Sequence, residues 1–311
     1  MRVFLKKYQK NLAAVVVTFN PDIKRLKILI DATLLEVASI ILVDNQSKNQ
    51  RSIEALIKNI SQINLTALSK NFGIAYAMNI GIEKAIEADN SFVLLLDQDS
   101  RPIFGMTQQL RSGFDKHKNV IAVGPNIFDH RTGDLLLRRE ANTSDYTEVE
   151  FLISSGTMID VKKLILVGGF RSDYFIDHVD TEWIFRCRRL GYRVLVSNKA
   201  LLEHEMGDRV LKVNVGLRDY MIYYHSPLRD YYMFRNTLLL IFDSTCPWVW
   251  KPMLLFRIPK FMAYFLLFGE KRLLRLRLML KGIWHGIRSI SGEFDIKKNK
   301  CIAVPKTSLD I

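Results

Sequence analysis

The sequence predicts an α/β fold with a largely parallel β-sheet between two layers of helices. Continuous apolar runs rich in β-branched residues recur through the N-terminal third, and amphipathic stretches lie between most of them. Such unbroken runs are typical of strands that are covered on both faces, as in parallel sheets with crossover helices. The length of 311 residues suits one such domain with an appended segment.

The first elements follow in chain order. The predicted strands are AAVVVTF, SIILVDN, INLTAL and SFVLLLD, at residues 13–19, 39–45, 63–68 and 91–97. Between the last two strands an apolar residue recurs at every fourth position, which predicts a helix with one apolar face. These residues are Ile74, Met78, Ile82 and Ile86. We therefore interpret the first 125 residues as a doubly wound α/β unit.

The middle of the chain is predicted to leave the sheet and return to it. Residues 126–150 are rich in polar and turn residues and predict a hairpin or loop, whereas FLISSGTMID at 151–160 predicts a further strand. The stretch DTEWIFRCRRLG at 180–191 predicts a helix that is closed by its glycine.

The last part of the chain, residues 237–311, differs in composition and predicts a segment separate from residues 1–236. It has 13 Lys and Arg against 5 Asp and Glu, in a chain of net charge +13, and mixes these cations with large apolar residues. A basic amphipathic helical segment of this kind is expected to lie in the membrane interface, peripherally at the inner face of the cytoplasmic membrane. The alternative is a helical cap whose apolar face completes the core.

Other features favour a cytoplasmic protein that does not cross the membrane. Arg257, Pro259 and Lys260 interrupt the most apolar stretch, so no run reaches the roughly 18 residues of a spanning helix. The basic residues before the first apolar run resemble a secretory signal, but a small-residue cleavage site is missing, and we interpret that run as the first strand. The three cysteines form no CxxC or Cys/His cluster, which suits a reducing compartment.

Two aspartates, Asp97 and Asp99, lie at the end of the buried run FVLLLD. The period of two along an extended chain puts both carboxylates on the same side. Such a pair suits a hard divalent cation, Mg²⁺ or Mn²⁺, which keeps positions open for the oxygens of a diphosphate. The alternative is an ordinary polar turn after a strand.

Polar residues also follow the other predicted strands, in TFNP, VDNQS and TALSKNFG. Open parallel sheets bind ligands outside the carboxyl ends of their strands, so these ends together predict a nucleotide crevice. Asp44 can accept a hydrogen bond from a nucleobase or a ribose hydroxyl, or it can only cap the following helix. GxGxxG and GxxxxGK[ST] are absent from the sequence, which argues against a dinucleotide site and a P-loop.

Taken together, these motifs resemble the inverting glycosyltransferases of family 2, which have the GT-A fold. The resemblance covers about residues 12–240 and rests on VVVTFNP, VDNQS, NFGIAYAMNIGI, DQDS, the glycine pair at 168–169 and VDTEWIFRCRRLGY, in this order. DQDS and FIDHVDTEW, followed by HSPLRDYYMFRN, are most similar to bacterial rhamnosyltransferases. The resemblance implies a Rossmann-like open mixed sheet flanked by helices, and dTDP-L-rhamnose as donor.

The resemblance also implies roles for the residues at the strand ends. Asp97 would reach the ribose or the metal, and Asp99 would hold the metal against the diphosphate. The nucleoside pocket would be lined by Thr18, Asn20 and Asp44, with Asn71, Gly73, Ala75 and Asn79 packed beside it.

An acceptor hydroxyl that attacks an anomeric carbon must lose its proton, so a carboxylate opposite the leaving diphosphate is required as a base. The resemblance gives this place to Asp180, with Glu182 and Asp177 in reserve. The alternative for these acids is a favourable first helical turn, and for Glu182 a salt bridge to Arg186. Single displacement inverts the anomeric carbon.

Further candidates lie downstream. His204 follows the last predicted strand, where the family often has a histidine that meets the metal or the diphosphate; a purely structural role is the alternative. In HSPLRDYYMFRN, the cations Arg229 and Arg235 can neutralise the leaving diphosphate. The alternative is a solvated helix with an aromatic packing face that includes Tyr231 and Tyr232.

The sequence thus predicts a metal-dependent inverting glycosyltransferase that moves L-rhamnose to a hydroxyl of a glycan or lipid-linked oligosaccharide, in the synthesis of a cell-surface polysaccharide such as O-antigen. A UDP-hexose donor is the nearest alternative. A nucleotidyltransferase is less favoured because its Gly-rich, cationic loop is missing, and a non-catalytic membrane-binding protein is also less favoured. No nucleic-acid partner is expected, because the excess cations lie among Trp, Phe and Leu.

Overall fold

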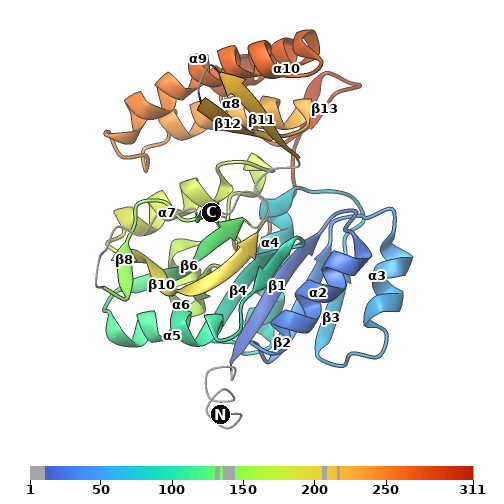
Figure 1. Ribbon diagram of the computed structural model, residues 1–311, viewed down its shortest axis with the longest axis vertical. Helices are drawn as coiled ribbons and strands as arrows, with labels where there is room; N and C mark the ends of the chain where they lie inside the picture. The colour runs from blue at the N-terminus through green and yellow to red at the C-terminus, as the bar shows by residue number, and fades with distance from the viewer. Residues whose placement is uncertain (1–10, 130–133, 136–143, 205–208, 216–217, 311) are drawn as a thin grey trace.

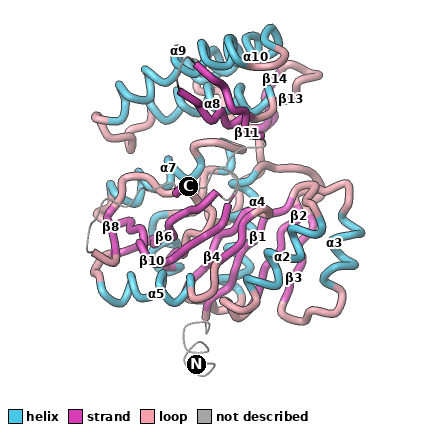
Figure 2. The backbone as a smooth tube through the Cα atoms, viewed as in Figure 1, coloured by secondary structure: helices cyan, strands magenta, loops and turns pink. Residues whose placement is uncertain are grey.

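The computed structural model in Figure 1 describes residues 11–129, 134–135, 144–204, 209–215 and 218–310. The basic flank before the first strand and the centre of the predicted excursion lie outside the described residues. The molecule has two parts: a twisted sheet with its helices, and above it in this view a smaller part made mostly of C-terminal helices (Figures 1 and 2).

The larger part is built on one mixed sheet of ten strands. These are β1 (Leu12–Thr18), β2 (Ser39–Asp44), β3 (Ile63–Ala67), β4 (Phe92–Asp97), β5 (Ser100–Pro102), β6 (Val120–Asp129), β7 (Asp134–Leu135), β8 (Tyr146–Glu148), β9 (Met158–Asp160) and β10 (Arg193–His204). The main path runs β3-β2-β1-β4-β9-β6-β10-β5, with β7 paired to β6 and β8 to β10. Strands β3, β2, β1 and β4 are parallel to one another, as are β6 and β10. Strand β9 is antiparallel to β4 and β6, and β5 is antiparallel to β10.

Helices cover both faces of this sheet. They are α2 (Ile23–Thr33), α3 (Gln50–Ile57), α4 (Ile74–Glu87), α5 (Met106–Lys116), α6 (Val161–Val167) and α7 (Val179–Arg189), with a 3₁₀ turn at Ser172–Tyr174. Ala13 and Val15 of β1 belong to a core with α4, α6 and α7, whereas Ala14 and Val16 belong to a core with α2, α3 and α5. Alternate residues of one strand are therefore buried on opposite faces, which confirms the doubly wound prediction.

Two details of this domain matter for the site. Helix α4 lies close against the sheet because Gly81 has no side chain; a Cβ there would overlap Val15. The strand predicted at 151–160 is shorter than expected, since only Met158–Asp160 form β9. The residues before it turn instead, and the Gly156 N–H donates to the Leu95 carbonyl (2.7 Å).

The smaller part contains α8 (Pro227–Phe242), α9 (Trp250–Phe268) and α10 (Arg272–Ile287), with the hairpins β11 (Arg209–Val215)–β12 (Arg218–Tyr224) and β13 (Glu293–Asp295)–β14 (Lys300–Ile302). The boundary predicted after residue 236 falls inside α8. The chain end returns to the sheet domain, where the Gly169 N–H donates to the Leu309 carbonyl (2.7 Å) and the Ser172 N–H to Asp310 (2.9 Å).

Candidate active site

Asp97, Asp99 and His204 form a cluster at the carboxyl end of the sheet. Asp97 ends β4, and His204 ends β10 opposite Ser100 in the antiparallel β5–β10 pair. The His204 Nε2 atom lies 3.9 Å from Asp97 Oδ2, and its Nδ1 atom lies 3.4 Å from Asp99 Oδ1. One possible ligand atom from each of the three residues lies within 4.8 Å of the others. The sheet therefore joins residues that are far apart in the sequence.

This cluster fits a hard divalent cation. Two carboxylates with one imidazole and no thiolate suit Mg²⁺ or Mn²⁺ better than a soft metal. The His204 ring is oriented by Ser100 Oγ at 3.0 Å, which itself contacts Ser155 Oγ. The aspartate side chains are 31% and 37% exposed, so the oxygens of a bound ligand can complete the coordination shell.

The predicted nucleoside residues at the ends of β1 and β2 are tightly connected. Asp44 is fully buried, and its carboxylate accepts from the Thr18 hydroxyl (2.9 Å), the Ser47 N–H (2.9 Å) and the Ser47 hydroxyl. These contacts hold the turn after β2; they do not cap the following helix, as the sequence alternative proposed, because α3 begins at Gln50 with Asn49 as its N-cap residue. Buried Thr18 and Asp44 thus shape the turn rather than reach solvent.

Asn20 and Asn71 lie nearer the surface of this crevice. Asn20 is exposed, has a left-handed backbone (φ 50°), and donates its N–H to Ser47 Oγ (2.7 Å). Asn71 accepts from the Asn45 amide (2.9 Å) and from the Gly73 N–H (2.9 Å). The Asn20 side chain accepts from the Lys48 N–H (2.8 Å), so both asparagines join the loops that follow β1, β2 and β3. Because they are more accessible than Thr18 and Asp44, they are the better candidates for a nucleoside contact.

Ala75 and Asn79, which the resemblance places beside the nucleoside pocket, lie in the interior of the protein. Both residues are fully buried. The Asn79 amide donates to the Phe170 carbonyl (2.7 Å) and accepts from the Phe170 N–H (2.9 Å), so it fastens the loop after α6 to α4. The small residue at Gly73 is needed for another reason, because a Cβ there would lie 2.5 Å from the Phe175 carbonyl.

Asp180, in the first turn of α7, has the environment of a base. Its Oδ1 accepts from the Thr181 N–H (2.7 Å), and the side chain is only partly exposed. Burial raises the pKa of Asp180 to about 6, against the lowering effect of the Thr181 bonds. The charges of Asp177 and Asp97 contribute to this raised pKa, so α7 begins within electrostatic reach of Asp97.

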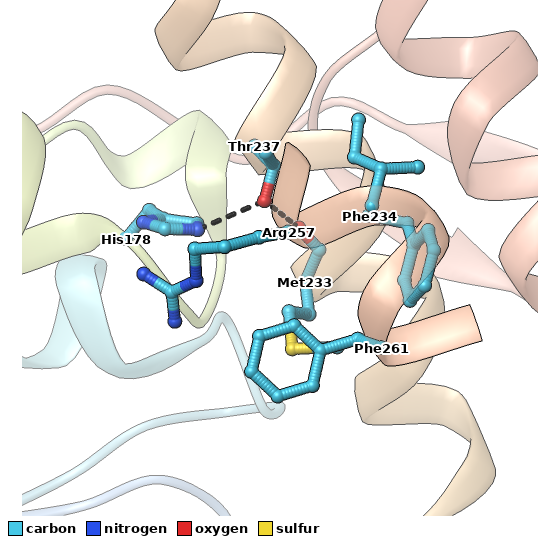
Figure 3. A pocket seen from close by; sticks show the side chains of 7 residues that line it. His178, Met233, Phe234, Thr237, Arg257 and Phe261 are labelled. Carbon is cyan, nitrogen blue, oxygen red and sulfur yellow. Dashed lines mark hydrogen bonds between the residues drawn. The ribbon is translucent and has the colours of Figure 1, made fainter. Parts of the chain in front are cut away.

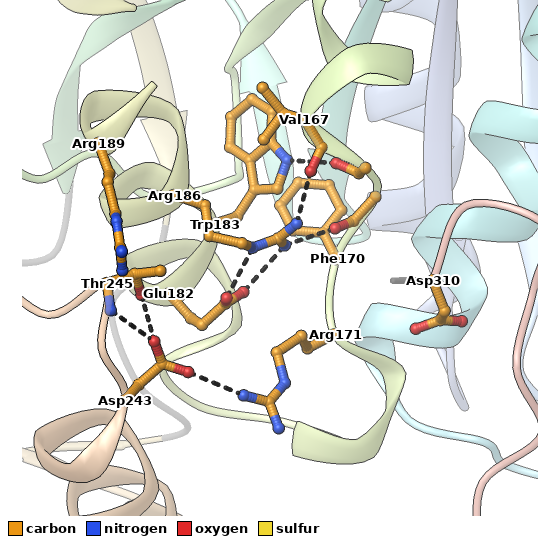
Figure 4. Close-up of polar contacts among 12 residues, drawn as sticks. Val167, Phe170, Arg171, Glu182, Trp183, Arg186, Arg189, Asp243, Thr245 and Asp310 are labelled. Atoms are coloured by element: carbon orange, nitrogen blue, oxygen red, sulfur yellow. Dashed lines mark hydrogen bonds and ion pairs between the residues drawn. The ribbon is translucent and has the colours of Figure 1, made fainter. Parts of the chain in front are cut away.

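Glu182 is a structural residue. It is 1% exposed and bonds through both oxygens to Arg186, at 2.6 and 2.9 Å, as the sequence alternative predicted. Arg186 also donates to the carbonyls of Val167 (3.0 Å) and Gly169 (2.6 Å). Figure 4 shows this network between α7 and the loop after α6. The reserve assignment of Glu182 as base is therefore not supported, because its carboxylate is buried and paired.

Arg229 and Arg235 both lie on α8, but they bind different groups. Arg229 Nε donates to Asp177 Oδ1 (3.0 Å), so Asp177 is neutralised by a cation and is a weaker candidate for the base. Arg235 is fully buried and donates to the carbonyls of Tyr174 (2.9 Å) and Gly292 (2.5 Å). The predicted contact of Arg235 with a diphosphate is wrong for this structure, since its guanidinium is enclosed by main chain. Tyr231 and Tyr232 are buried, as expected for an aromatic packing face.

Comparisons with known proteins agree with this geometry. The family described as glycosyl transferase family 2 matches residues 13–167. The dTDP-rhamnosyl transferase RfbF of Shigella flexneri is 31% identical over 249 residues, which cover 76% of this chain and 82% of RfbF. The chain belongs to glycosyltransferase family 2. It is therefore an enzyme of the glycosyltransferase class, as the sequence predicted.

Solved structures confirm the GT-A fold of this family 2 glycosyltransferase. S. aureus TarS 1–349 in complex with UDP-GlcNAc superposes with a TM-score of 0.56 at 15% identity, over 90% of this chain and 81% of that one. GalNAc-T7 with UDP, GalNAc and Mn²⁺ gives a TM-score of 0.54 at 15% identity, over 62% of this chain. The match spans only 43% of GalNAc-T7.

The sequence did not point to two features of this family 2 enzyme. A small, shallow hollow opens beside the start of α7 and is lined by His178, Met233, Phe234, Thr237, Arg257, Ile258 and Phe261 (Figure 3). Asn236, next to it on α8, donates to three main-chain carbonyls of the single turn before α7. The Arg-Asn pair that ends HSPLRDYYMFRN is the sequence feature that could have indicated Asn236, but the prediction considered only the charge of the arginine.

Proposed function

We propose that this glycosyltransferase moves L-rhamnose from dTDP-L-rhamnose, with inversion, to a hydroxyl of a glycan or lipid-linked oligosaccharide acceptor. The observation that carries the proposal is the raised pKa of Asp180 within electrostatic reach of the Asp97–Asp99–His204 cluster. A general base that accepts the proton of the acceptor hydroxyl and a cation that neutralises the leaving group are what a single displacement requires. The 31% identity to a dTDP-rhamnosyl transferase supports the choice of donor.

In this proposal Asp99, Asp97 and His204 hold Mg²⁺ or Mn²⁺. When bound, the cation neutralises charge on the departing diphosphate. Asp180 accepts the proton of the attacking hydroxyl as the new glycosidic bond forms, and the bond to the diphosphate breaks on the opposite face of the sugar. Thr181 keeps one carboxylate oxygen in place by its two bonds to Oδ1, which leaves Oδ2 to take the proton.

The choice of donor is tested by a panel of nucleotide sugars with Mg²⁺ or Mn²⁺. We expect dTDP-L-rhamnose to raise the Tm by about 5 °C at a hundredfold excess over its dissociation constant, because a ligand that binds only the folded state stabilises it. We also expect dTDP-L-rhamnose to be hydrolysed faster than UDP-glucose or UDP-GlcNAc. A larger shift and faster hydrolysis with a UDP-hexose would replace our donor with the alternative one.

We also propose that α9 and α10 bind the anionic inner face of the cytoplasmic membrane. No helix among the described residues is both long and apolar enough to span a bilayer. Large apolar side chains are nevertheless exposed there, including Trp248 (84%), Phe256 (70%) and Leu273 (85%). The cations of the same stretch, such as Lys260 and Arg277, suit anionic headgroups.

Substitutions test this surface better than truncation does, because the chain end after α10 returns to the sheet domain. We expect the triple variant Trp248→Ser, Phe256→Ser, Leu273→Ser to lose most of its co-sedimentation with phosphatidylglycerol vesicles. The control is Leu166→Ser, which removes a side chain 74% exposed on α6. Equal sedimentation of the triple variant and the wild type would contradict the interfacial proposal, as would equal binding to phosphatidylcholine vesicles.

A further inference from the structure

Three residues immediately before α7 have a left-handed backbone. They are Phe175 (φ 66°), Asp177 (φ 66°) and His178 (φ 59°), and none of them is glycine. Non-glycine residues adopt this conformation rarely and keep it only where the surrounding structure holds them. The 174–178 turn, meaning residues 174 to 178, therefore needs external support. It leads into the helical turn that carries Asp180.

Asn236 of α8 supplies support at three points of the turn. Its Nδ2 group donates to the carbonyls of Tyr174 (2.9 Å), Ile176 (2.7 Å) and Asp177 (2.9 Å). The side chain is fully buried, and its Oδ1 accepts from Arg235 Nε (2.8 Å). The Arg235 bond fixes the amide with its N–H groups toward the turn, because a guanidinium can only donate.

Other residues of α8 contact the side chains of the same turn. The Tyr232 ring stacks on Phe175 with centroids 4.9 Å apart and planes 11° apart. Arg229 pairs with Asp177, and Thr237 Oγ1 lies 3.0 Å from His178 Nε2. Each of the three residues with positive φ thus has a side-chain contact to α8. The main chain of the turn is also held by Arg235, which donates to the Tyr174 carbonyl (2.9 Å), and by the Ile74 N–H, which donates to the Phe175 carbonyl (2.8 Å), whereas Asn236 holds the carbonyls of Ile176 and Asp177, nearest to α7.

We infer that Asn236 is a positioning residue: it holds the 174–178 turn in its left-handed conformation and so sets the place of the Asp180 carboxylate opposite the metal cluster. The inference rests on the proposed role of Asp180 as base. Asn236 contacts no reacting atom in this arrangement. Its loss should therefore affect the rate of transfer and leave donor binding largely unchanged, since the donor is held at the strand ends.

The first test is the Asn236→Ala variant, measured by transfer kinetics at saturating donor. We expect kcat to fall by about 100-fold, the size of effect seen when a reacting group is misplaced by about 1 Å. The KM for the donor and the donor-induced Tm shift are expected to stay within threefold of wild type. If Asn236→Ala does not fold, Asn236→Ser keeps one small donor and is measured in the same way.

Rescue by glycine separates positioning from general stability. Glycine adopts the left-handed conformation without steric cost, so adding His178→Gly to Asn236→Ala should raise kcat by about tenfold. Thr107→Ala is the matched control: Thr107 is also buried, and its hydroxyl donates to Glu36 far from the site (2.8 Å). We expect this control to lower the Tm and to keep kcat.

Three results would overturn the inference: a kcat for Asn236→Ala within threefold of wild type, a parallel loss of donor binding, or no gain from His178→Gly. The proposed function is judged separately by Asp180→Asn. If that variant retains turnover, the base is misassigned whatever Asn236 does. If Asp180→Asn is inactive and the Asn236 variants keep their kcat, only the positioning role fails.

Discussion

Asp180→Asn is expected to abolish turnover and to leave donor binding intact. A positioned general base contributes about 10²–10⁴-fold to a rate, so kcat should fall by about 10³-fold. Asparagine keeps the shape of the side chain and can still accept from the Thr181 N–H, which holds Oδ1 at 2.7 Å in the wild type. The measurement is the initial rate of transfer at saturating donor, with the donor-induced Tm shift as the control for binding.

The pH dependence of the wild type provides a second observation on the same residue. The pKa of Asp180 is raised to about 6, chiefly by burial and in part by the Asp97 charge. A base must be ionised to accept a proton, so kcat/KM should rise with pH with its midpoint at about pH 6. A bound cation beside Asp97 opposes its charge, so saturating metal should move this limb to lower pH. The residual kcat/KM of Asp180→Asn should not show this rise with pH.

Stability separates this variant from a misfolded one. A carboxyl whose pKa is raised on folding favours the folded state below its unfolded pKa, and this contribution is lost as the pH rises through about 6. At pH 7.5 the wild type therefore carries a partly desolvated carboxylate, and Asp180→Asn should have a higher Tm. Asp177→Asn is the matched comparison, because it breaks the 3.0 Å pair with Arg229. Loss of turnover in Asp177→Asn alone would make Asp177 the base.

Local patterns were enough to predict the sheet and the proximity of Asp97, Asp99 and His204. The strands are continuous apolar runs, and the carboxyl ends of parallel neighbours meet at one edge, so the polar residues that follow them must gather there. Asp97 ends β4 and Asp99 lies two residues later, in the turn before β5, so their proximity is a matter of local geometry. His204 is more distant, but it too follows a strand, and its pairing opposite Ser100 completes the cluster.

Residues whose role depends on packing were harder to predict. Arg235 and Glu182 carry charges that suggest contact with a ligand, yet both are buried. Arg235 donates to main-chain carbonyls, and Glu182 pairs with Arg186. Nothing in a helical pattern distinguishes an arginine that faces a crevice from one that is enclosed by a folded turn. Asn236 was missed for the same reason, because the main-chain carbonyls that it binds belong to a turn about 60 residues earlier in the chain.

Asp99→Ala is expected to lower transfer as strongly as chelation does. A metal that neutralises a departing diphosphate contributes several kcal/mol to the transition state, which corresponds to a loss of about 10³-fold in kcat/KM. EDTA should inactivate the wild type, and added Mn²⁺ should restore it but should not restore Asp99→Ala.

His204→Ala should need more Mn²⁺ for half-maximal activity, because two carboxylates remain. Asp31→Ala, which removes an aspartate 57% exposed on α2, is the control and should behave as wild type. Transfer by Asp99→Ala at the wild-type rate, in EDTA as in Mn²⁺, would remove the metal from the mechanism. The 3.4 Å contact between Asp99 and His204 would then serve only to join the β4–β5 turn to β10.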